Sequence, residues 1–169
     1  MSLQKLTAEF VGTLALTFLV ICSLVFSVSF PTPVIAGLTL GLFVYLLASV
    51  SGAHFNPAIT IAMFSIGKIK AKEGFLYIVS QFLGALCACG LAKALFEMQP
   101  NLVVSSDTIV GVGEGLGAAF FAFGVTTVVF KRVSDVMSGI VVGTSLFIGI
   151  TVASSMSNGV LNPAVAFGI

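Results

Sequence analysis

The tripeptide Asn-Pro-Ala occurs twice in this chain, at Asn56-Pro57-Ala58 and at Asn162-Pro163-Ala164. The first copy opens an apolar run over residues 57–66, which at about 1.5 Å per residue covers about half of a ~30 Å hydrocarbon core. Asparagine is a strong helix cap, and proline suits the first helical position. The sequence therefore predicts two half-length helices that start at mid-membrane depth, where free backbone groups must be buried in protein or line a cavity.

The composition is typical of a protein embedded in a lipid bilayer. Of the 169 residues, 58% are apolar and 8% are charged, whereas a soluble domain carries about 25% charged residues. The formal net charge of +1 argues against a nucleic acid partner, which requires a clustered basic surface. His54 is the one histidine, and the three cysteines lie in apolar stretches. We therefore expect no metal site, no cofactor and no catalytic residue.

Long apolar stretches predict five membrane spans, which end at polar breaks or at prolines. A polar break at residues 99–108 divides the chain into two halves. We expect residues 1–98 to hold three spans and the first half-helix, at 57–66. Residues 109–169 should hold two spans and the start of the second half-helix. The five predicted spans cover residues 6–30, 34–50, 74–96, 109–130 and 137–156.

The two halves are related in sequence. Glu9 lies in Ala-Glu-Phe-Val-Gly and Glu114 lies in Gly-Glu-Gly-Leu-Gly, an offset of 105 residues, and Asn56 and Asn162 are 106 residues apart. Two markers at nearly the same offset indicate an internal duplication. Because each complete unit would cross the membrane an odd number of times, the second unit would be inverted relative to the first. The repeat also predicts a sixth span, absent from this sequence, in about 30 to 40 further residues.

The positions of lysine and arginine predict the orientation in the membrane. If the first half-helix re-enters the side from which it came, six of the seven basic residues lie on one face, and Lys93 lies opposite. Cytoplasmic loops carry an excess of lysine and arginine, which places the N-terminus in the cytoplasm. The six residues on that face are Lys5, Lys68, Lys70, Lys72, Lys131 and Arg132.

The two asparagine side chains have donors to spare. Each side-chain oxygen can accept from the free amides of the first helical turn, which leaves the NH2 group to donate outward. If the half-helices meet end to end, Asn56 and Asn162 present donors side by side, and two helix dipoles converge, each like about half a positive charge. A water held there cannot accept from its neighbours, so a proton relay is interrupted, and cations meet a positive barrier.

Two carboxylates, Glu9 and Glu114, lie within predicted spans. An unpaired charge in hydrocarbon is costly, so each is expected to face the bundle interior with a partner. The expected partners are backbone amides of the irregular segments before the asparagines, residues 51–55 and 157–161. We interpret both glutamates as structural braces, with proton carriage as the alternative.

These motifs resemble those of the aquaporin and glycerol-facilitator family, the major intrinsic proteins, over nearly the whole chain. The resemblance implies an all-α membrane protein with an inverted repeat, a right-handed bundle of six helices and two re-entrant half-helices, and one pore per subunit in a homotetramer. The motifs are Ala8-Glu9-Phe10, Ser51-Gly52-Ala53-His54-Phe55-Asn56-Pro57-Ala58, Glu114, Asn162-Pro163-Ala164 and Phe167-Gly168. The resemblance further implies a ladder of backbone carbonyls that accept from the permeant, at Gly52, Ala53, His54, Asn158, Gly159 and Val160.

One region departs from the pattern of that family. Members usually carry arginine directly after the second Asn-Pro-Ala, at a narrow outer filter, whereas this chain has Val165. The other filter positions correspond to Ala36, Ile150 and Gly159, so all four are apolar. The resemblance thus implies a wider, more apolar constriction than that of a strict water channel. Water could pass, as could small neutral solutes such as glycerol, urea, ammonia or hydrogen peroxide.

Two other functions stay open at this point. The missing filter arginine and the absent sixth span also suit a degenerate member that acts as a structural subunit of a larger membrane complex. An ion-coupled transporter built on inverted repeats is disfavoured, because apart from Glu9 and Glu114 the sequence places no charges at the membrane midplane.

Overall fold

The computed structural model describes residues 2–26, 28–97 and 107–169. Over this part of the chain every regular element is helical, and five helices are long and apolar enough to cross a membrane, as predicted. Two short helices follow the two asparagines, and the 3-10 turn Asp135–Met137 leads into the last long helix. The long helices are α1 (Leu3–Val25), α2 (Thr32–Ser51), α4 (Ala71–Phe96), α5 (Thr108–Val129) and α6 (Ser138–Ala153), and the short ones are α3 (Pro57–Ser65) and α7 (Pro163–Gly168).

The ends of two spans differ from the sequence prediction. The apolar stretch 6–30 is helical only to Val25, and Phe26 is extended. The hydroxyl of Ser23 donates to that of Thr32 across the connection at 3.1 Å. Likewise α6 ends at Ala153 rather than at residue 156. Apolar character alone does not set where a helix stops, because connections at the membrane interface can be apolar too. The predicted polar break at 99–108 lies mostly outside the described residues.

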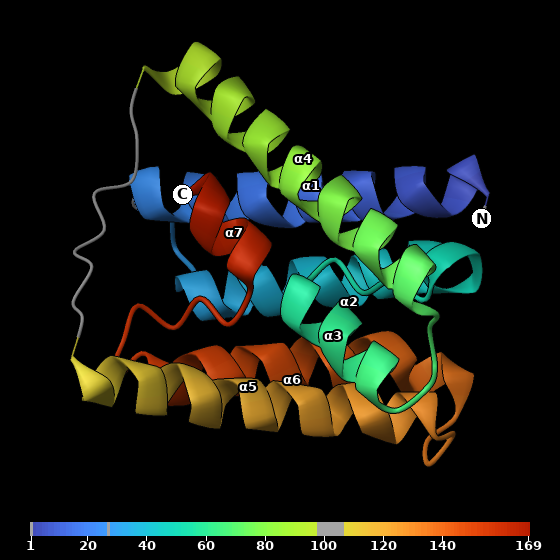
Figure 1. The fold of residues 1–169 in the computed structure, drawn as a ribbon. Helices are drawn as coiled ribbons and strands as arrows, with labels where there is room; N and C mark the ends of the chain where they lie inside the picture. Colours follow the sequence, from blue (N-terminus) through green and yellow to red (C-terminus); the bar gives the residue numbers. More distant parts are fainter. Residues whose placement is uncertain (1, 27, 98–106) are drawn as a thin grey trace.

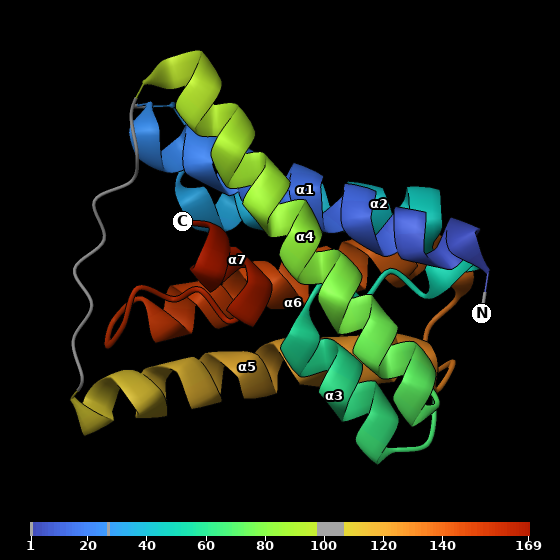
Figure 2. The same ribbon diagram turned by 45° about the horizontal axis from the view of Figure 1, so that its top comes forward.

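The two short helices start near the centre of the bundle and run apart. Figures 1 and 2 show α3 running from the middle of the molecule toward the end that holds the N-terminus, and α7 running toward the other end. The nine residues of α3 extend about 14 Å, less than half of a bilayer core. The long helices pack beside them, with α1 against α4 and α2, and α6 against α2 and α5. This is the re-entrant, inverted arrangement that the two Asn-Pro-Ala motifs predict.

Glycines bring α6 into backbone contact with α2. A Cβ atom on Gly143 would lie 2.4 Å from the carbonyl oxygen of Gly37, and one on Gly37 would lie 2.7 Å from the carbonyl oxygen of Gly143. Real Cβ atoms do not approach a carbonyl so closely, so any larger residue at this crossing must push the helices apart. Small residues at such a crossing are typical of membrane helix pairs. The contact fixes the wall from which Leu146 and Ile150 of α6 face the interior.

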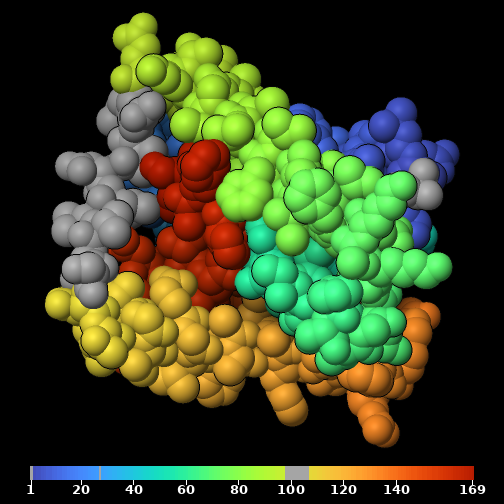
Figure 3. All heavy atoms as spheres, viewed as in Figure 1, coloured from blue at the N-terminus to red at the C-terminus, as the bar shows by residue number. Residues whose placement is uncertain are grey.

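The two repeats are covered unequally by the described helices. α4 packs closely on α1, where a Cβ atom on Gly84 would lie 2.4 Å from the carbonyl oxygen of Phe10. On α5, Gly111 and Gly115 have no atom within 4 Å of a Cβ position. Figure 3 shows α7 at the surface between α4 and α5, and Phe167 of α7 is 62% exposed. In the part of the chain that the structure describes, these positions of α5 and α7 are therefore not covered by another helix.

Candidate functional site

Each short helix is capped by the asparagine that precedes it. The side-chain oxygen of Asn56 accepts from the amide of Ala58 at 2.8 Å. That of Asn162 accepts from the amides of Ala164 and Val165 at 3.1 and 3.4 Å. Pro57 and Pro163 occupy the first helical positions, where no amide hydrogen is needed. Both caps therefore take the form expected from the sequence, and both asparagines are buried.

The two caps are also joined to each other across the bundle. The side-chain nitrogen of Asn56 donates to the carbonyl of Leu161 at 2.9 Å, and that of Asn162 donates to the carbonyl of Phe55 at 2.8 Å. Each asparagine thus binds the residue that precedes the other asparagine, and the tips of α3 and α7 lie against one another. Each NH2 group carries two hydrogens, so one hydrogen per asparagine remains for a molecule in the adjoining space. The sequence offered no signal for this exchange.

Glu9 is fully buried in α1 and organises the segment before Asn56. One carboxylate oxygen accepts from the Ser51 hydroxyl at 2.6 Å and from the amide of His54 at 3.0 Å. The other accepts from the amide of Phe55 at 2.7 Å and from the side-chain amide of Gln81 at 2.8 Å. Four donors compensate the desolvated carboxylate, as a charge inside a membrane requires.

Glu114 of α5 makes the matching contacts in the second repeat. Its carboxylate accepts from the Ser157 hydroxyl at 2.7 Å and from the amides of Val160 and Leu161 at 3.1 and 2.9 Å. These donors lie 106 residues after Ser51, His54 and Phe55. Among the described residues no side chain takes the place that Gln81 has at Glu9, and Glu114 is half-buried. The two carboxylates lie where the sequence expected them, with amide partners from 51–55 and 157–161.

The segments that end at the asparagines have strained backbones at equivalent places. Phe55 and Leu161 have φ angles of 48° and 54°, although neither is glycine. Such left-handed conformations cost on the order of 1–3 kcal/mol each and persist where the surroundings hold them. Here the amides of both residues donate to a glutamate, and their carbonyls accept from the opposite asparagine. The glutamates and the asparagines together fix the backbone that carries the helix tips.

Three polar residues in this network were not singled out from the sequence. Gln81 donates to the Thr60 hydroxyl at 2.9 Å as well as to Glu9, and the Tyr77 hydroxyl donates to the carbonyl of Ser51 at 2.7 Å. All three side chains are buried. A usable signal existed for Gln81, because a lone amide within an otherwise apolar span is expected to have a buried partner.

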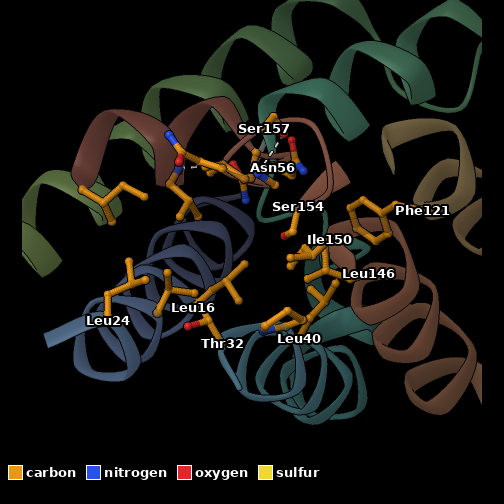
Figure 4. A pocket seen from close by; sticks show the side chains of 18 of the residues that line it. Leu16, Leu24, Thr32, Leu40, Asn56, Phe121, Leu146, Ile150, Ser154 and Ser157 are labelled. Carbon is orange, nitrogen blue, oxygen red and sulfur yellow. Dashed lines mark hydrogen bonds between the residues drawn. The ribbon is translucent and has the colours of Figure 1, made fainter. Parts of the chain in front are cut away.

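Two cavities follow one another along the bundle. The larger, of about 440 Å³, is lined by both asparagines and reaches Leu24 and Thr32 (Figure 4). We call it the large cavity. The second, of about 270 Å³, reaches Lys68 and Val129 at the end that holds the N-terminus, and we call it the small cavity. His54 and Phe121 line both, so the two spaces adjoin beside the paired helix tips.

Most of the residues expected at the filter and the carbonyl ladder line these cavities. Side chains from α1, α2, α5 and α6 point into the large cavity, among them Leu16, Leu40, Phe121 and Ile150 (Figure 4). The large cavity is lined by Ile150, Val165, Asn158, Gly159 and Val160, and the small cavity by Gly52, Ala53 and His54.

Ala36, the fourth expected filter residue, is not among the lining residues. It is 2% exposed, whereas Pro33 and Leu40, about one turn away on either side along α2, line the large cavity. The methyl group of alanine is too short to reach past these larger neighbours. The wall at this position is therefore made by Pro33 and Leu40.

The charge of the lining is sparse. None of the described residues that line the large cavity is a lysine, arginine, aspartate or glutamate. Among the described residues of the small cavity, Lys68 is the one with a charged side chain. The large cavity has an apolar wall opposite a polar strip formed by Asn56, Asn162 and the segment 157–160. Such a lining suits a molecule that forms a few hydrogen bonds and carries no charge.

Comparisons with known proteins agree with this geometry. The sequence model of the major intrinsic protein family matches residues 1–169. Aquaporin NIP1-1 of Arabidopsis thaliana is 31% identical over 98% of this chain and 63% of its own length. Glycerol uptake facilitator protein-like 6 of Lactiplantibacillus plantarum is 31% identical over 98% of this chain and 82% of its own length.

Among solved structures, the X-ray structure of the aquaglyceroporin from Plasmodium falciparum has a TM-score of 0.81 at 22% identity, covering 98% of this chain and 78% of that one. That likeness shows the fold. The chain spans 63% of the length of Aquaporin NIP1-1 and 66% of that of Nodulin-26 from Glycine max.

Proposed function

The chain belongs to the major intrinsic protein family, and from this premise we propose that it forms a passive channel for water and small neutral solutes. The observation that carries the proposal is the reciprocal bonding of Asn56 and Asn162, which sets two helix tips side by side where the large and small cavities adjoin. A solute would pass from one cavity to the other beside these tips.

Ions would be excluded at the same place. The N-termini of α3 and α7 converge there, and each helix dipole acts as about half a positive charge. Each asparagine NH2 would donate its remaining hydrogen to the oxygen of a passing water. That oxygen then cannot accept from neighbouring waters. A proton relay would be broken and cations repelled, while a neutral acceptor is held and released.

The lining of the large cavity bears on the choice of solute. With Val165, Ile150 and Gly159 at the filter positions, and Pro33 and Leu40 in front of Ala36, none of the described residues brings a fixed cation into the large cavity. The carbon chain of glycerol could lie on the apolar wall while its hydroxyls donate to the carbonyls of 52–54 or 158–160. Urea could donate to the same carbonyls through its NH2 groups. We therefore propose neutral solutes of this kind, with ammonia and hydrogen peroxide, beside water.

The remaining features follow from this function. Glu9 and Glu114 act as braces that hold the pore backbone, and passage needs neither turnover chemistry nor a cofactor. The N-terminus would lie in the cytoplasm, which the positive-inside rule supports. The basic residues expected on that face are Lys5, Lys68, Lys70, Lys72, Lys131 and Arg132. Subunits of this kind would assemble as a homotetramer in the bilayer.

Osmotic water flux across the membrane of vesicles tests the proposal. The chain is reconstituted into liposomes, and shrinkage after a hyperosmotic step with an impermeant solute is followed by light scattering. We expect water permeability several-fold above that of protein-free vesicles, and re-swelling when glycerol or urea is the osmolyte. Correctly folded protein that gives no more flux than bare lipid would reject the channel and favour a structural subunit of a larger complex.

A further inference from the structure

Lys68 is held at the opening of the small cavity by the end of the first half-helix. Its amide donates to the carbonyl of Met63 at 2.8 Å, and the amide of Gly67, whose φ is 72°, donates to that of Phe64 at 3.0 Å. These bonds close the C-terminus of α3 and fix the backbone of Lys68. Because Lys68 both lines the cavity and is exposed, it marks the place where the cavity opens.

The side chain of Lys68 reaches from the loop after α3 to the C-terminal end of α5. Its ammonium nitrogen lies 4.8 Å from the centroid of the Phe130 ring, within the range of a cation–π contact. Phe130 follows Val128 and Val129, which line the same cavity. The contact therefore holds a positive charge beside the opening, at the end of the molecule that holds the N-terminus (Figure 1).

The surroundings make this charge different from the other lysines at that end. The small cavity is walled largely by apolar side chains such as Val44, Val125 and Val142, and low-dielectric walls concentrate the field of a nearby charge inside a cleft. Lys70 and Lys72 follow closely in sequence but do not line either cavity. Lys72 is exposed like Lys68 but lies outside the cavity lining, so no apolar wall concentrates its field in the passage.

We propose that Lys68 adds to the charge selectivity of the passage, as a fixed positive charge at the opening of the small cavity that lowers the entry of cations before they reach the helix tips. The proposal rests on the channel function proposed above. Lys68 would supply a positive charge at the end of the passage that holds the N-terminus. The filter positions carry no such charge, because Val165 stands where the family usually has arginine. Neutral solutes would pass Lys68 unhindered, because its ammonium rests on Phe130 at the side of the opening.

A charge series at position 68 tests the proposal. Lys68→Gln, Lys68→Glu and the matched control Lys72→Glu are reconstituted with the parent, and potassium leak and water flux are measured in the same vesicles. We expect leak to rise in the order parent, Lys68→Gln, Lys68→Glu, by roughly threefold per step at about 10 mM salt and much less at 1 M salt. Lys72→Glu should stay near the parent, and water flux should be unchanged throughout.

Three results would overturn it. The first is a potassium leak that rises equally in Lys68→Glu and Lys72→Glu, and the second is a leak that rises in neither. The third is a water flux that changes in parallel with the leak, which would mean that Lys68 acts by its bulk. A parent that gives no water flux rejects the channel itself, whereas a conducting parent with an unaltered Lys68 series rejects only this role. Should Lys68→Glu fail to insert, the comparison of Lys68→Gln with Lys72→Gln carries the same outcomes.

Discussion

The side-chain nitrogen of Asn56 donates to the carbonyl of Leu161 at 2.9 Å, across 105 positions of sequence. The reciprocal bond from Asn162 to Phe55 has nearly the same length. Each asparagine thereby caps its own helix with its oxygen and secures the other helix with its nitrogen. The pair fixes both tips in one place without a covalent link, and each amide keeps one hydrogen for a molecule in the adjoining cavities.

Replacing the donors with acceptors should open the passage to cations. In Asn56→Asp or Asn162→Asp, the oxygen cap can remain, but the NH2 donor is lost and a negative charge offsets the two helix dipoles. We expect proton leak, followed with a pH-sensitive dye inside vesicles, to rise about tenfold or more. Leak equal to that of the parent, in a variant that still conducts water, would contradict the account of ion exclusion.

The two glutamates should differ in their contribution to stability. Glu9→Gln offers one acceptor oxygen where four donors converge, so buried amides lose partners at a cost of about 2–4 kcal/mol. Glu114→Gln affects three donors in a half-buried place and should cost less, about 1–2 kcal/mol. Thermal unfolding in detergent should therefore show a larger fall in Tm for Glu9→Gln. Equal shifts would mean that Gln81 and the deeper burial add nothing at Glu9.

The α2–α6 crossing should reject even a methyl group. Gly143→Ala puts a Cβ against the Gly37 carbonyl and should destabilise the protein by about 1–3 kcal/mol, visible as a lower Tm. Gly90→Ala is the matched control, because nothing lies within 4 Å of its Cβ position, and the change should be neutral or slightly stabilising. A Gly143→Ala protein as stable as Gly90→Ala would show that the backbones do not touch.

A cation at the filter should narrow the range of solutes. Val165 is buried and lines the large cavity, so Val165→Arg places a long charged side chain in the passage. We expect glycerol flux to fall several-fold while water flux falls less, because a fixed donor and a smaller opening favour the smaller molecule. Val165→Leu controls for bulk alone. If Val165→Arg left the ratio of glycerol flux to water flux unaltered, the filter would lie elsewhere.

Local chemistry in the sequence predicted the helix starts well. Pro57 and Pro163 after Asn56 and Asn162 can begin a helix but cannot easily lie within one, and the apolar run after Asn56 is too short to cross. The lone carboxylates Glu9 and Glu114 needed donors, and the irregular segments before the asparagines were the expected source. The helix starts depend on residue chemistry over short ranges, which a single sequence displays, whereas the partners of the glutamates follow from the cost of an unpaired charge in hydrocarbon.

What the sequence did not reveal depends on long-range packing. Nothing in the motif says that Asn56 binds Leu161, since that contact needs both repeats folded together. Ala36 has the expected position along α2. It does not line the large cavity, because the larger side chains of Pro33 and Leu40 on either side extend past its methyl group. The end of α1 at Val25, within an apolar stretch, is set by the turn toward Thr32 rather than by hydropathy.

Blocking the proposed passage from within tests the central claim most directly. The background protein has Cys22, Cys87 and Cys89 replaced by alanine. In it, Ile150→Cys places a thiol in the large cavity. The control Ile148→Cys places a thiol on the same helix at a position where the side chain is 41% exposed. After treatment with a bulky thiol reagent, water flux should fall to nearly that of bare vesicles for Ile150→Cys and stay unchanged for Ile148→Cys. Undiminished flux through fully labelled Ile150→Cys protein would contradict a route through this cavity.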